Sequence, residues 1–197
     1  MNNLHLFYLI NAASGIGPVQ RGFAVALAEW TIYLIPLLMA AAWVGGDRRA
    51  RRELLQMLMA SVLALGIAQI VVYAWPHPRP FVLHLGTQYL AHVADSSLPS
   101  DHVVVFWSLA LAAFGTRRFG PWGFPLLAFG LAVGWSRVHL GVHFPFDILA
   151  AFPVALAGAT GAYGLRNRSL PLFAGILYFY DRAMQAARAK LTAPRKA

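Results

Sequence analysis

Long apolar stretches separated by short polar loops restrict what this chain can fold into more than any other feature. A helix that crosses the hydrocarbon core of a bilayer needs about 20 residues. The stretches near that length are residues 22–44, 54–75, 100–116, 122–135 and 144–165, of which the third and fourth are short. Because 59% of the 197 residues are hydrophobic, one small soluble core could not bury them all. The pattern predicts an all-α, polytopic membrane helical bundle with five to six transmembrane helices.

Shorter segments flank the predicted spans. Residues 4–10 are apolar but too short to cross a bilayer, so we expect an interfacial helix there, closed by a turn at Gly15, within an N-terminal segment of residues 1–20. Residues 170–197 begin apolar and become basic and amphipathic, which predicts a tail on the cytoplasmic membrane surface. No cleavable signal peptide or second domain is evident, so residues 1–197 are interpreted as one membrane-embedded domain.

The positions of the basic residues indicate how the spans are oriented. The net charge is +9, but the cations are distributed among loops instead of forming one face that would bind nucleic acid. If the spans alternate in direction, one side of the membrane receives most of the cations: Arg48, Arg49, Arg51, Arg52, Arg117, Arg118, Arg166, Arg168 and those of the tail. The positive-inside rule makes that side cytoplasmic. We therefore expect a multi-pass protein whose partners include membrane lipids and no nucleic acid; its oligomeric state is left open.

The seven histidines all lie on or beside the opposite, extracytoplasmic side, so chemistry is expected there. For His5, His84 and His92 the sequence favours a role as interfacial polar residues. His102 and His143 differ, because each lies where a span meets an outer loop. The absence of cysteine excludes thiolate catalysis and disulfides.

Two clusters of polar residues flank the long outer loop. Arg79 follows the second span and offers a rigid fork of donors that suits phosphate oxygens. At the start of the third span, Ser100 as N-cap and the backbone N–H of Asp101 would form an anion site, with His102 beside it. Each cluster alone has an ordinary structural alternative, either an arginine that anchors a helix end or a Ser-Asp helix start.

A third cluster surrounds the start of the fifth span. Arg137 precedes it, and Pro145 suits the first turn of a helix, which puts His143 just before that helix and Asp147 inside its first turn. There the carboxylate can accept a hydrogen bond from one imidazole nitrogen and leave the other free as a nucleophile. Together the three clusters supply an anion-binding cradle, a nucleophile and a general acid.

At these positions the sequence resembles the type 2 phosphatidic acid phosphatase superfamily. The family pattern reads Lys, six residues, Arg-Pro; then Pro-Ser-Gly-His; then Ser-Arg, five residues, His, three residues, Asp. The matching residues are Arg79-Pro80, Pro99-Ser100 with His102, and Ser136-Arg137 with His143 and Asp147. The resemblance implies that His143 accepts the phosphoryl group as a phosphohistidine, that Asp147 orients it and that His102 protonates the leaving group. It also implies that Arg79, Ser100 and Arg137 hold the phosphate, with no metal and no cofactor.

Two departures from that pattern matter. Val72 occupies the lysine position, and Gln69, His77 and His139 are candidates to replace part of its donor role. Asp101 replaces the motif glycine, and Pro-Ser-Asp-His, Arg-Pro-Phe-Val and Gly-Val-His-Phe-Pro-Phe-Asp resemble the bacterial undecaprenyl-diphosphatase branch. The resemblance thus implies hydrolysis of an isoprenoid lipid diphosphate, undecaprenyl diphosphate, to undecaprenyl phosphate during cell wall biogenesis, on the outer face of the bacterial inner membrane. Because His102 must start protonated and His143 neutral, we expect a bell-shaped pH profile.

Several alternatives stay open. Glu29 lies inside the first span, where an ionisable group is expensive, and either pairs with Arg79 or Arg137 or forms a structural hydrogen bond between helices. The residues do not separate the hydrolase from a lipid phosphotransferase or from a phosphatase acting on phosphatidylglycerophosphate or phosphatidic acid. A non-enzymatic transporter is disfavoured because the charges gather at one interface and not along a midplane path. A vanadate-dependent peroxidase is disfavoured by the predicted spans.

Overall fold

The computed structural model describes residues 2–192, and all regular secondary structure in that range is helical. The α-helices are α1 (Asn3–Ile10), α2 (Pro18–Val25), α3 (Thr31–Gly45), α4 (Arg48–Ala74), α5 (Asp101–Phe114), α6 (Gly123–His139) and α7 (Pro145–Thr192). A π-helical turn, Ala26–Trp30, joins α2 to α3 without a break, and 3₁₀ turns occupy Pro80–Leu83 and Gly120–Trp122.

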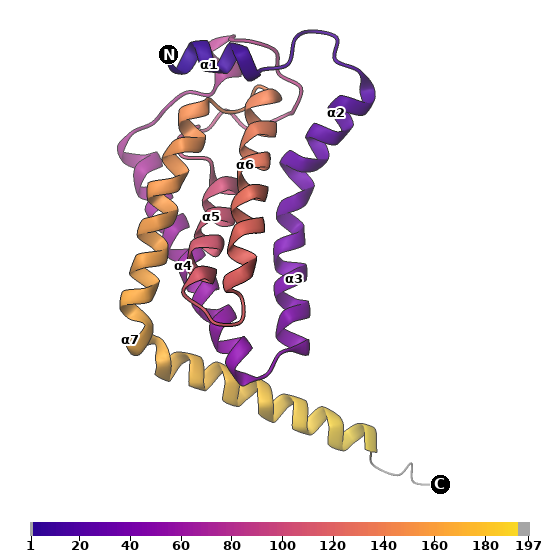
Figure 1. The fold of residues 1–197 in the computed structure, drawn as a ribbon, viewed down its shortest axis with the longest axis vertical. Helices are drawn as coiled ribbons and strands as arrows, with labels where there is room; N and C mark the ends of the chain where they lie inside the picture. Colours follow the sequence, from indigo (N-terminus) through magenta and orange to yellow (C-terminus); the bar gives the residue numbers. More distant parts are fainter. Residues whose placement is uncertain (1, 193–197) are drawn as a thin grey trace.

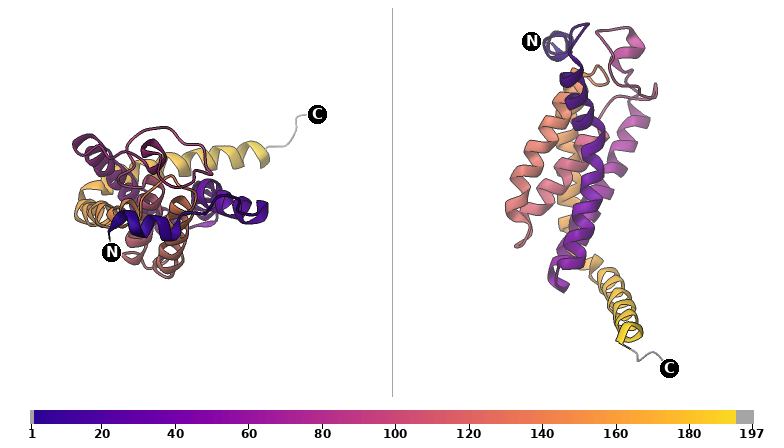
Figure 2. Two further views of the ribbon diagram at one scale, coloured as in Figure 1. Left: turned by 90° about the horizontal axis from the view of Figure 1, so that it is seen from above. Right: turned by 90° about the vertical axis from the view of Figure 1, so that its right-hand side faces the viewer.

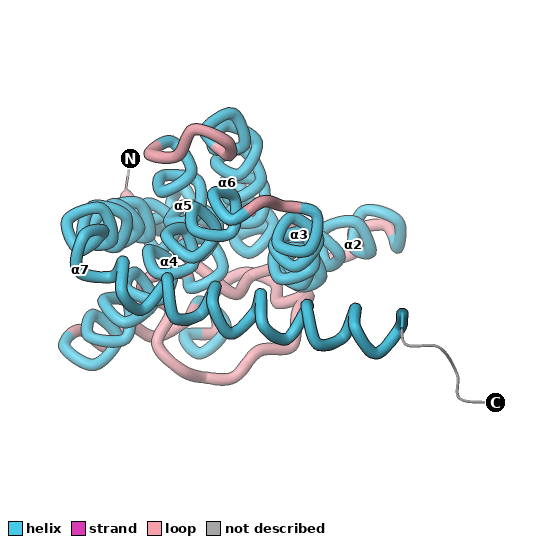
Figure 3. Tube along the Cα trace, turned by 90° about the horizontal axis from the view of Figure 1, so that it is seen from below, coloured by secondary structure: helices cyan, strands magenta, loops and turns pink. Residues whose placement is uncertain are grey.

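Helices α3 to α6 and the first part of α7 run along the long axis of the molecule, and α1 lies across one end (Figures 1 and 2). We call this the loop end, because residues 75–100 also cross it, and we call the other the basic end. Helix α5 packs against α4, α6 and α7 (Figure 3). Small residues allow α4 and α7 to approach closely: a Cβ on Gly158 would lie 2.5 Å from the Cβ of Ala64.

Three helical segments are long and apolar enough to span a membrane: Pro18–Gly45, Arg48–Ala74 and Pro145–Lys190. Large apolar side chains such as Leu37, Val62 and Leu149 are exposed on the sides of the bundle, as expected where lipid is the solvent. Helices α5 and α6 coincide with the third and fourth predicted spans and have only 14 and 17 residues. The all-helical prediction is confirmed for the described residues, with three spans of sufficient length.

The N-terminal helix forms where the sequence placed it. The Asn2 side chain caps it by accepting from the His5 N–H at 2.9 Å, and Gly15 turns the chain with a φ of +90°. Phe7 is fully buried and packs against Phe144 with ring centroids 5.3 Å apart. The Asn11 side chain also bonds main-chain groups of two loop-end segments. Helix α1 therefore closes the loop end.

The C-terminal segment differs from the separate tail that the sequence suggested. Helix α7 continues from Pro145 through Thr192 (Figures 1 and 3). Its distal part, by which we mean the residues after Pro171, runs away from the bundle. Pro171 lies inside the helix and removes one main-chain donor. The distal part is tied to the basic end, because Asp181 lies 3.0 Å from Nε of Arg48 and the Arg51 guanidinium lies 4.5 Å from the Tyr180 ring centroid. Residues 193–197 lie outside the described range.

Candidate active site

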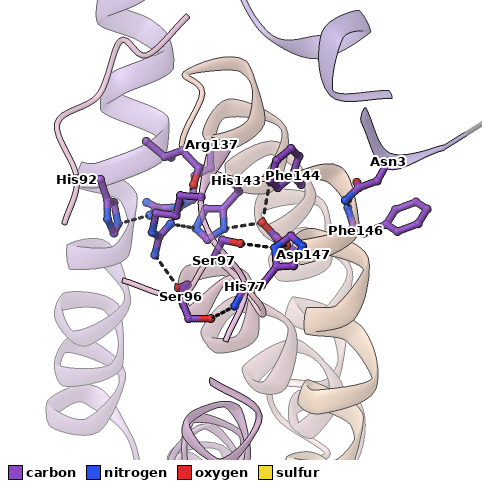
Figure 4. Close-up of polar contacts among 12 residues, drawn as sticks. Asn3, His77, His92, Ser96, Ser97, Arg137, His143, Phe144, Phe146 and Asp147 are labelled. Carbon is purple, nitrogen blue, oxygen red and sulfur yellow. Dashed lines mark hydrogen bonds and ion pairs between the residues drawn. The ribbon is translucent and has the colours of Figure 1, made fainter. Parts of the chain in front are cut away.

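The polar clusters predicted from sequence meet at the loop end, where α5 and α7 begin and α6 ends. The main-chain N–H of Ser100 donates to the Asp147 carbonyl at 3.2 Å, which joins the starts of α5 and α7. The loop of residues 75–100 passes over the same point and contributes buried polar side chains (Figure 4). The two helix starts therefore bring together residues that are 47 positions apart in the sequence.

His143 and Asp147 form a buried pair. The imidazole Nδ1 lies 3.3 Å from Oδ2 of Asp147, and the same oxygen accepts from the Phe144 N–H at 2.7 Å. His143 is 2% exposed and Asp147 fully buried. The spacing of four residues predicted this pair, because Pro145 starts the helix between them. The carboxylate therefore fixes the orientation of the ring.

The other imidazole nitrogen of His143 faces a cation. Nε2 lies 3.0 Å from Nη1 of Arg79, and because a guanidinium only donates, Nε2 is the acceptor and the ring proton is on Nδ1. Burial lowers the pKa of His143 well below its usual value, and the charges of Arg137 and Arg79 lower it further. His143 is therefore a neutral imidazole with its lone pair directed at the arginine.

Arg79 is held by four groups. Its Nε donates to Asp95 at 2.8 Å, its Nη2 to the Ser96 carbonyl at 3.2 Å, and its Nη1 to the Val142 carbonyl at 2.9 Å as well as to His143. Partial burial opposes ionisation of Asp95, but the hydrogen bond and charge of Arg79 outweigh it and lower the pKa of that carboxyl. Asp95 was not singled out from the sequence, because a lone carboxylate in a loop carries no pattern.

Arg137 enters the site from the last turn of α6 and is 2% exposed. Its Nη1 donates to the Ala28 carbonyl at 3.1 Å, its Nη2 lies 2.9 Å from Nε2 of His92, and its Nε is buried without a hydrogen-bond partner among the described residues. Ala28 belongs to the π-helical turn, and π turns displace carbonyls from the regular helical pattern. That turn thus positions an acceptor for the guanidinium.

Ser100 and His102 lie at the start of α5. Ser100 precedes α5 as expected, but its hydroxyl does not cap the helix; it is buried and has no partner within residues 2–192. His102 is half-buried in the first turn, within electrostatic reach of Arg137, His143 and Arg79. Asp101 is exposed. The Ser100 hydroxyl and the Arg137 Nε are both buried donors without a hydrogen-bond partner among the described residues.

Comparisons with known proteins identify the family of the chain. The sequence profile of the family described as "PAP2 superfamily" matches residues 53–171. The chain belongs to the PAP2 superfamily. It is 35% identical to YbjG of Escherichia coli (strain K12) over 81% of this chain and 80% of that protein, and 32% identical to undecaprenyl-diphosphatase BcrC of Bacillus subtilis (strain 168) over 78% and 79%. These relatives confirm the undecaprenyl-diphosphatase branch that the sequence motifs indicated.

A solved structure has the same fold. The crystal structure of Aquifex aeolicus LpxE superposes with a TM-score of 0.66 at 20% identity, and the match covers 82% of this chain and 94% of that one. The two proteins therefore share the arrangement of helices.

The residues proposed to replace the PAP2 motif lysine lie in different places. His77 is near the site, with Nδ1 3.0 Å from the Ser97 hydroxyl and 3.9 Å from Oδ1 of Asp147, on the side away from the arginines. His139, contrary to expectation, points away: Nδ1 bonds the Ile10 carbonyl at 2.9 Å and the ring stacks on Trp135. It therefore anchors the N-terminal segment.

Gln69 and Glu29 also lie apart from the phosphate-binding groups. The Gln69 side chain is exposed on α4. Glu29 is exposed on the π-helical turn and forms no ion pair with Arg79 or Arg137 in the part of the chain that the structure describes. Pairing with an arginine was one of the two alternatives left open for Glu29; instead the carbonyl of the neighbouring Ala28 accepts the hydrogen bond from Arg137.

His92, like Asp95, was not predicted as a site residue from the sequence. It was interpreted as an interfacial polar residue, yet its Nε2 bonds Arg137 and its ring centroid lies 6.4 Å from that of His143. No local pattern distinguishes it from His84 in the same loop, which is exposed. Only the folding of the loop over α6 and α7 brings His92 to the arginines.

An apolar cavity of about 340 Å³ opens between α3 and the helices α4, α5 and α6. Phe106 and Leu109 of α5 line it, and they follow His102 by four and seven residues, which places all three on one face of the helix. Leu38 of α3 and Phe129 of α6 line other walls. The cavity therefore begins one helical turn below His102.

Proposed function

We propose that this PAP2 protein is a lipid diphosphate phosphatase that hydrolyses undecaprenyl diphosphate to undecaprenyl phosphate. The observation that carries the proposal is the buried neutral His143, oriented from behind by Asp147 and facing Arg79 and Arg137. The name of the Bacillus subtilis relative, undecaprenyl-diphosphatase, supports the substrate. A buried imidazole with a free lone pair beside two guanidinium groups fits nucleophilic attack on a phosphate.

In the first step Nε2 of His143 attacks the terminal phosphorus. A nitrogen–phosphorus bond forms and the bond from phosphorus to the bridging oxygen breaks. His102 donates a proton to that oxygen, which leaves as part of the lipid monophosphate. Water then attacks the phosphorus of the phosphohistidine while His102 takes a proton from it; the nitrogen–phosphorus bond breaks, Nε2 of His143 regains its lone pair, and inorganic phosphate departs. The chain's own imidazoles carry every proton transfer in this scheme.

The phosphate oxygens would be held by the unsatisfied donors. A buried polar group without a partner costs about 1–3 kcal/mol, and the Ser100 hydroxyl and the Arg137 Nε are both in this state. A phosphate between the two arginines would satisfy them and would also accept the Arg79 N–H that now faces His143. Substrate binding therefore frees the nucleophilic lone pair at the moment when the phosphorus arrives.

The isoprenoid chain is proposed to enter the apolar cavity. The leaving lipid monophosphate must lie on the His102 side, because His102 protonates its oxygen. The cavity begins one turn below His102, and its lining is almost entirely hydrophobic. A long chain continues from the cavity into the surrounding bilayer.

For the topology we propose a single domain whose α2–α3, α4, α5, α6 and α7 cross the membrane. The first two and α7 meet the length requirement, and α5 and α6 complete the alternation if the bilayer thins locally around them. The arginine-rich loops then lie in the cytoplasm, together with the distal part of α7. The site at the loop end faces the cell exterior.

The test is a phosphate-release assay on the purified protein in detergent with a chelator present. Undecaprenyl diphosphate should release inorganic phosphate, while phosphatidic acid and phosphatidylglycerophosphate should release much less. Activity that chelator abolishes and metal restores would overturn the metal-free mechanism. Transfer of radiolabelled phosphate to an added lipid in preference to water would instead identify a phosphotransferase.

A further inference from the structure

His92 faces the phosphate-binding arginines in the same manner as the nucleophile. Nε2 of His92 lies 2.9 Å from Nη2 of Arg137, and Nε2 of His143 lies 3.0 Å from Nη1 of Arg79 (Figure 4). Each arginine is thus bonded to one imidazole lone pair. The mechanism uses only one of the two histidines.

The hydrogen bonds fix the protonation of His92 in the ligand-free protein. Because Arg137 can only donate, Nε2 of His92 accepts and its ring proton is on Nδ1, 3.1 Å from the Val93 carbonyl. Burial lowers the pKa of His92; the bond to Val93 opposes this effect, and the charges of Arg79 and Arg137 add to it. His92 is therefore a neutral acceptor before substrate binds.

A bound diphosphate changes that environment. Phosphate oxygens are stronger acceptors for a guanidinium than imidazole nitrogen is, so they take the Nη2–H of Arg137. The Nε2 lone pair of His92 would then face an anion, which is unfavourable unless Nε2 gains a proton. The charged or titratable groups around His92 are Arg79, Arg137, Asp95, His143 and His102, with Arg21 in the adjoining groove.

A route for that proton is present. His92 lines an outer groove of about 460 Å³ together with Arg21 and Gln88. The groove contains polar side chains and leads from the surface to the imidazole. Asp95, whose Oδ1 lies 3.8 Å from Nδ1 of His92, would stabilise the imidazolium once formed.

We propose that His92 takes up one proton from solvent when the diphosphate binds and then donates a hydrogen bond to it, as a substrate-recognising residue. This inference rests on the proposed function. It assigns to His92 the positive charge that Val72 cannot provide at the motif's lysine position. Loss of the His92 charge should weaken substrate binding and leave the chemical step unchanged, because His143 attacks the phosphorus and His102 protonates the leaving oxygen.

Kinetics of His92→Gln provide the first test. Glutamine retains a neutral acceptor for Arg137 but cannot become charged, so KM for undecaprenyl diphosphate should rise about tenfold at pH 6, as for the loss of one charge-assisted hydrogen bond. The ratio of mutant to wild-type KM should fall toward one by pH 9, while kcat changes by less than about twofold. A KM ratio that is independent of pH, or an effect on kcat alone, would overturn the proposal.

Two further variants separate charge from structure. Val72→Lys added to His92→Gln should restore a low KM and make it insensitive to pH, because lysine stays charged throughout this range. His5→Gln, a change at an exposed histidine on α1, is the control and should match wild type. Failure of Val72→Lys to restore KM, with a folded double mutant, would count against the charge assignment.

A binding measurement distinguishes failure of this proposal from failure of the proposed function. Methylenediphosphonate, a non-hydrolysable diphosphate, is titrated calorimetrically into the full-length protein in two buffers of different ionisation enthalpy. Wild type should take up one proton more than His92→Gln. Equal proton uptake, or no binding, overturns the role of His92. Proton uptake without hydrolysis of undecaprenyl diphosphate would overturn only the proposed function.

Discussion

At the basic end of the bundle Arg48 reaches Asp181 across largely exposed surface, with a side chain that is 65% exposed. At the loop end Arg137 is 2% exposed, and two of its three nitrogens are bonded to groups from other segments. Exposed ion pairs contribute little to stability because water screens them. A buried guanidinium interacts strongly with neighbouring charged and polar groups, because the dielectric constant around it is low. We therefore propose different roles for the same residue type, orientation in the membrane at the basic end and phosphate binding at the loop end.

The largest effect should come from removing the nucleophile at the loop end. His143→Ala should lower kcat for phosphate release from undecaprenyl diphosphate by about 10³-fold or more, since residual activity would depend on binding groups alone. Phosphate release is measured in detergent, with circular dichroism to verify folding. An active, folded His143→Ala protein would show that the attacking group lies elsewhere.

The second largest effect is expected when the same substitution is made in an arginine at each end, Arg137 and Arg48. Arg137→Gln should reduce kcat/KM by about 10²-fold to 10³-fold, the usual cost of one preorganised charge-stabilising donor. Arg48→Gln should change it by less than about twofold, because Arg48 is exposed and distant from the site. Similar losses for both variants would remove the distinction between the ends.

A smaller effect is expected at the apolar cavity between α3 and the helices α4, α5 and α6. Leu38→Trp would fill part of it and should raise KM for undecaprenyl diphosphate by about tenfold, while a short-chain substrate such as farnesyl diphosphate is affected less. Leu37→Trp is the matched control, since Leu37 is equally exposed on α3 but does not line the cavity. If both variants behave alike, the chain binds elsewhere.

The pH dependence of kcat/KM should show the effect of the buried arginines on the pKa of His143. Because the pKa of His143 is lowered by burial and then by Arg137 and Arg79, its nucleophilic form persists below the ordinary histidine value of about 6.5. The acid limb of kcat/KM should lie below that pH. Arg137→Gln removes a positive charge, so it should raise the pKa of His143 and shift the limb to higher pH. An unmoved limb would exclude Arg137 as a cause.

The smallest effect is expected at the basic end itself. Asp181→Asn breaks the pairs with Arg48 and Arg51, and should lower the free energy of unfolding by less than about 1 kcal/mol. Turnover should be unchanged. The melting temperature in detergent, measured at low and high salt, provides the check, and a large loss would mean that the distal part of α7 is an essential support.

The sequence by itself determined the helices and the pair at the start of α7. Apolar runs of membrane-spanning length can only satisfy their main chain as helices, and Pro145 with a spacing of four residues puts His143 on Asp147 without reference to the rest of the fold. The motifs likewise identified Arg79 and Arg137, because their spacing was sufficient to indicate the family.

The tertiary structure decided the contacts between segments far apart in the chain. It turned His139 toward Ile10, directed the Ala28 carbonyl in place of Glu29 at Arg137, and brought His92 and Asp95 to the arginines from a loop without any local pattern. These contacts depend on how α1, the π-helical turn and residues 75–100 pack over the loop end. A local sequence pattern specifies geometry over one helical turn, and the partners of a buried guanidinium come from much farther away.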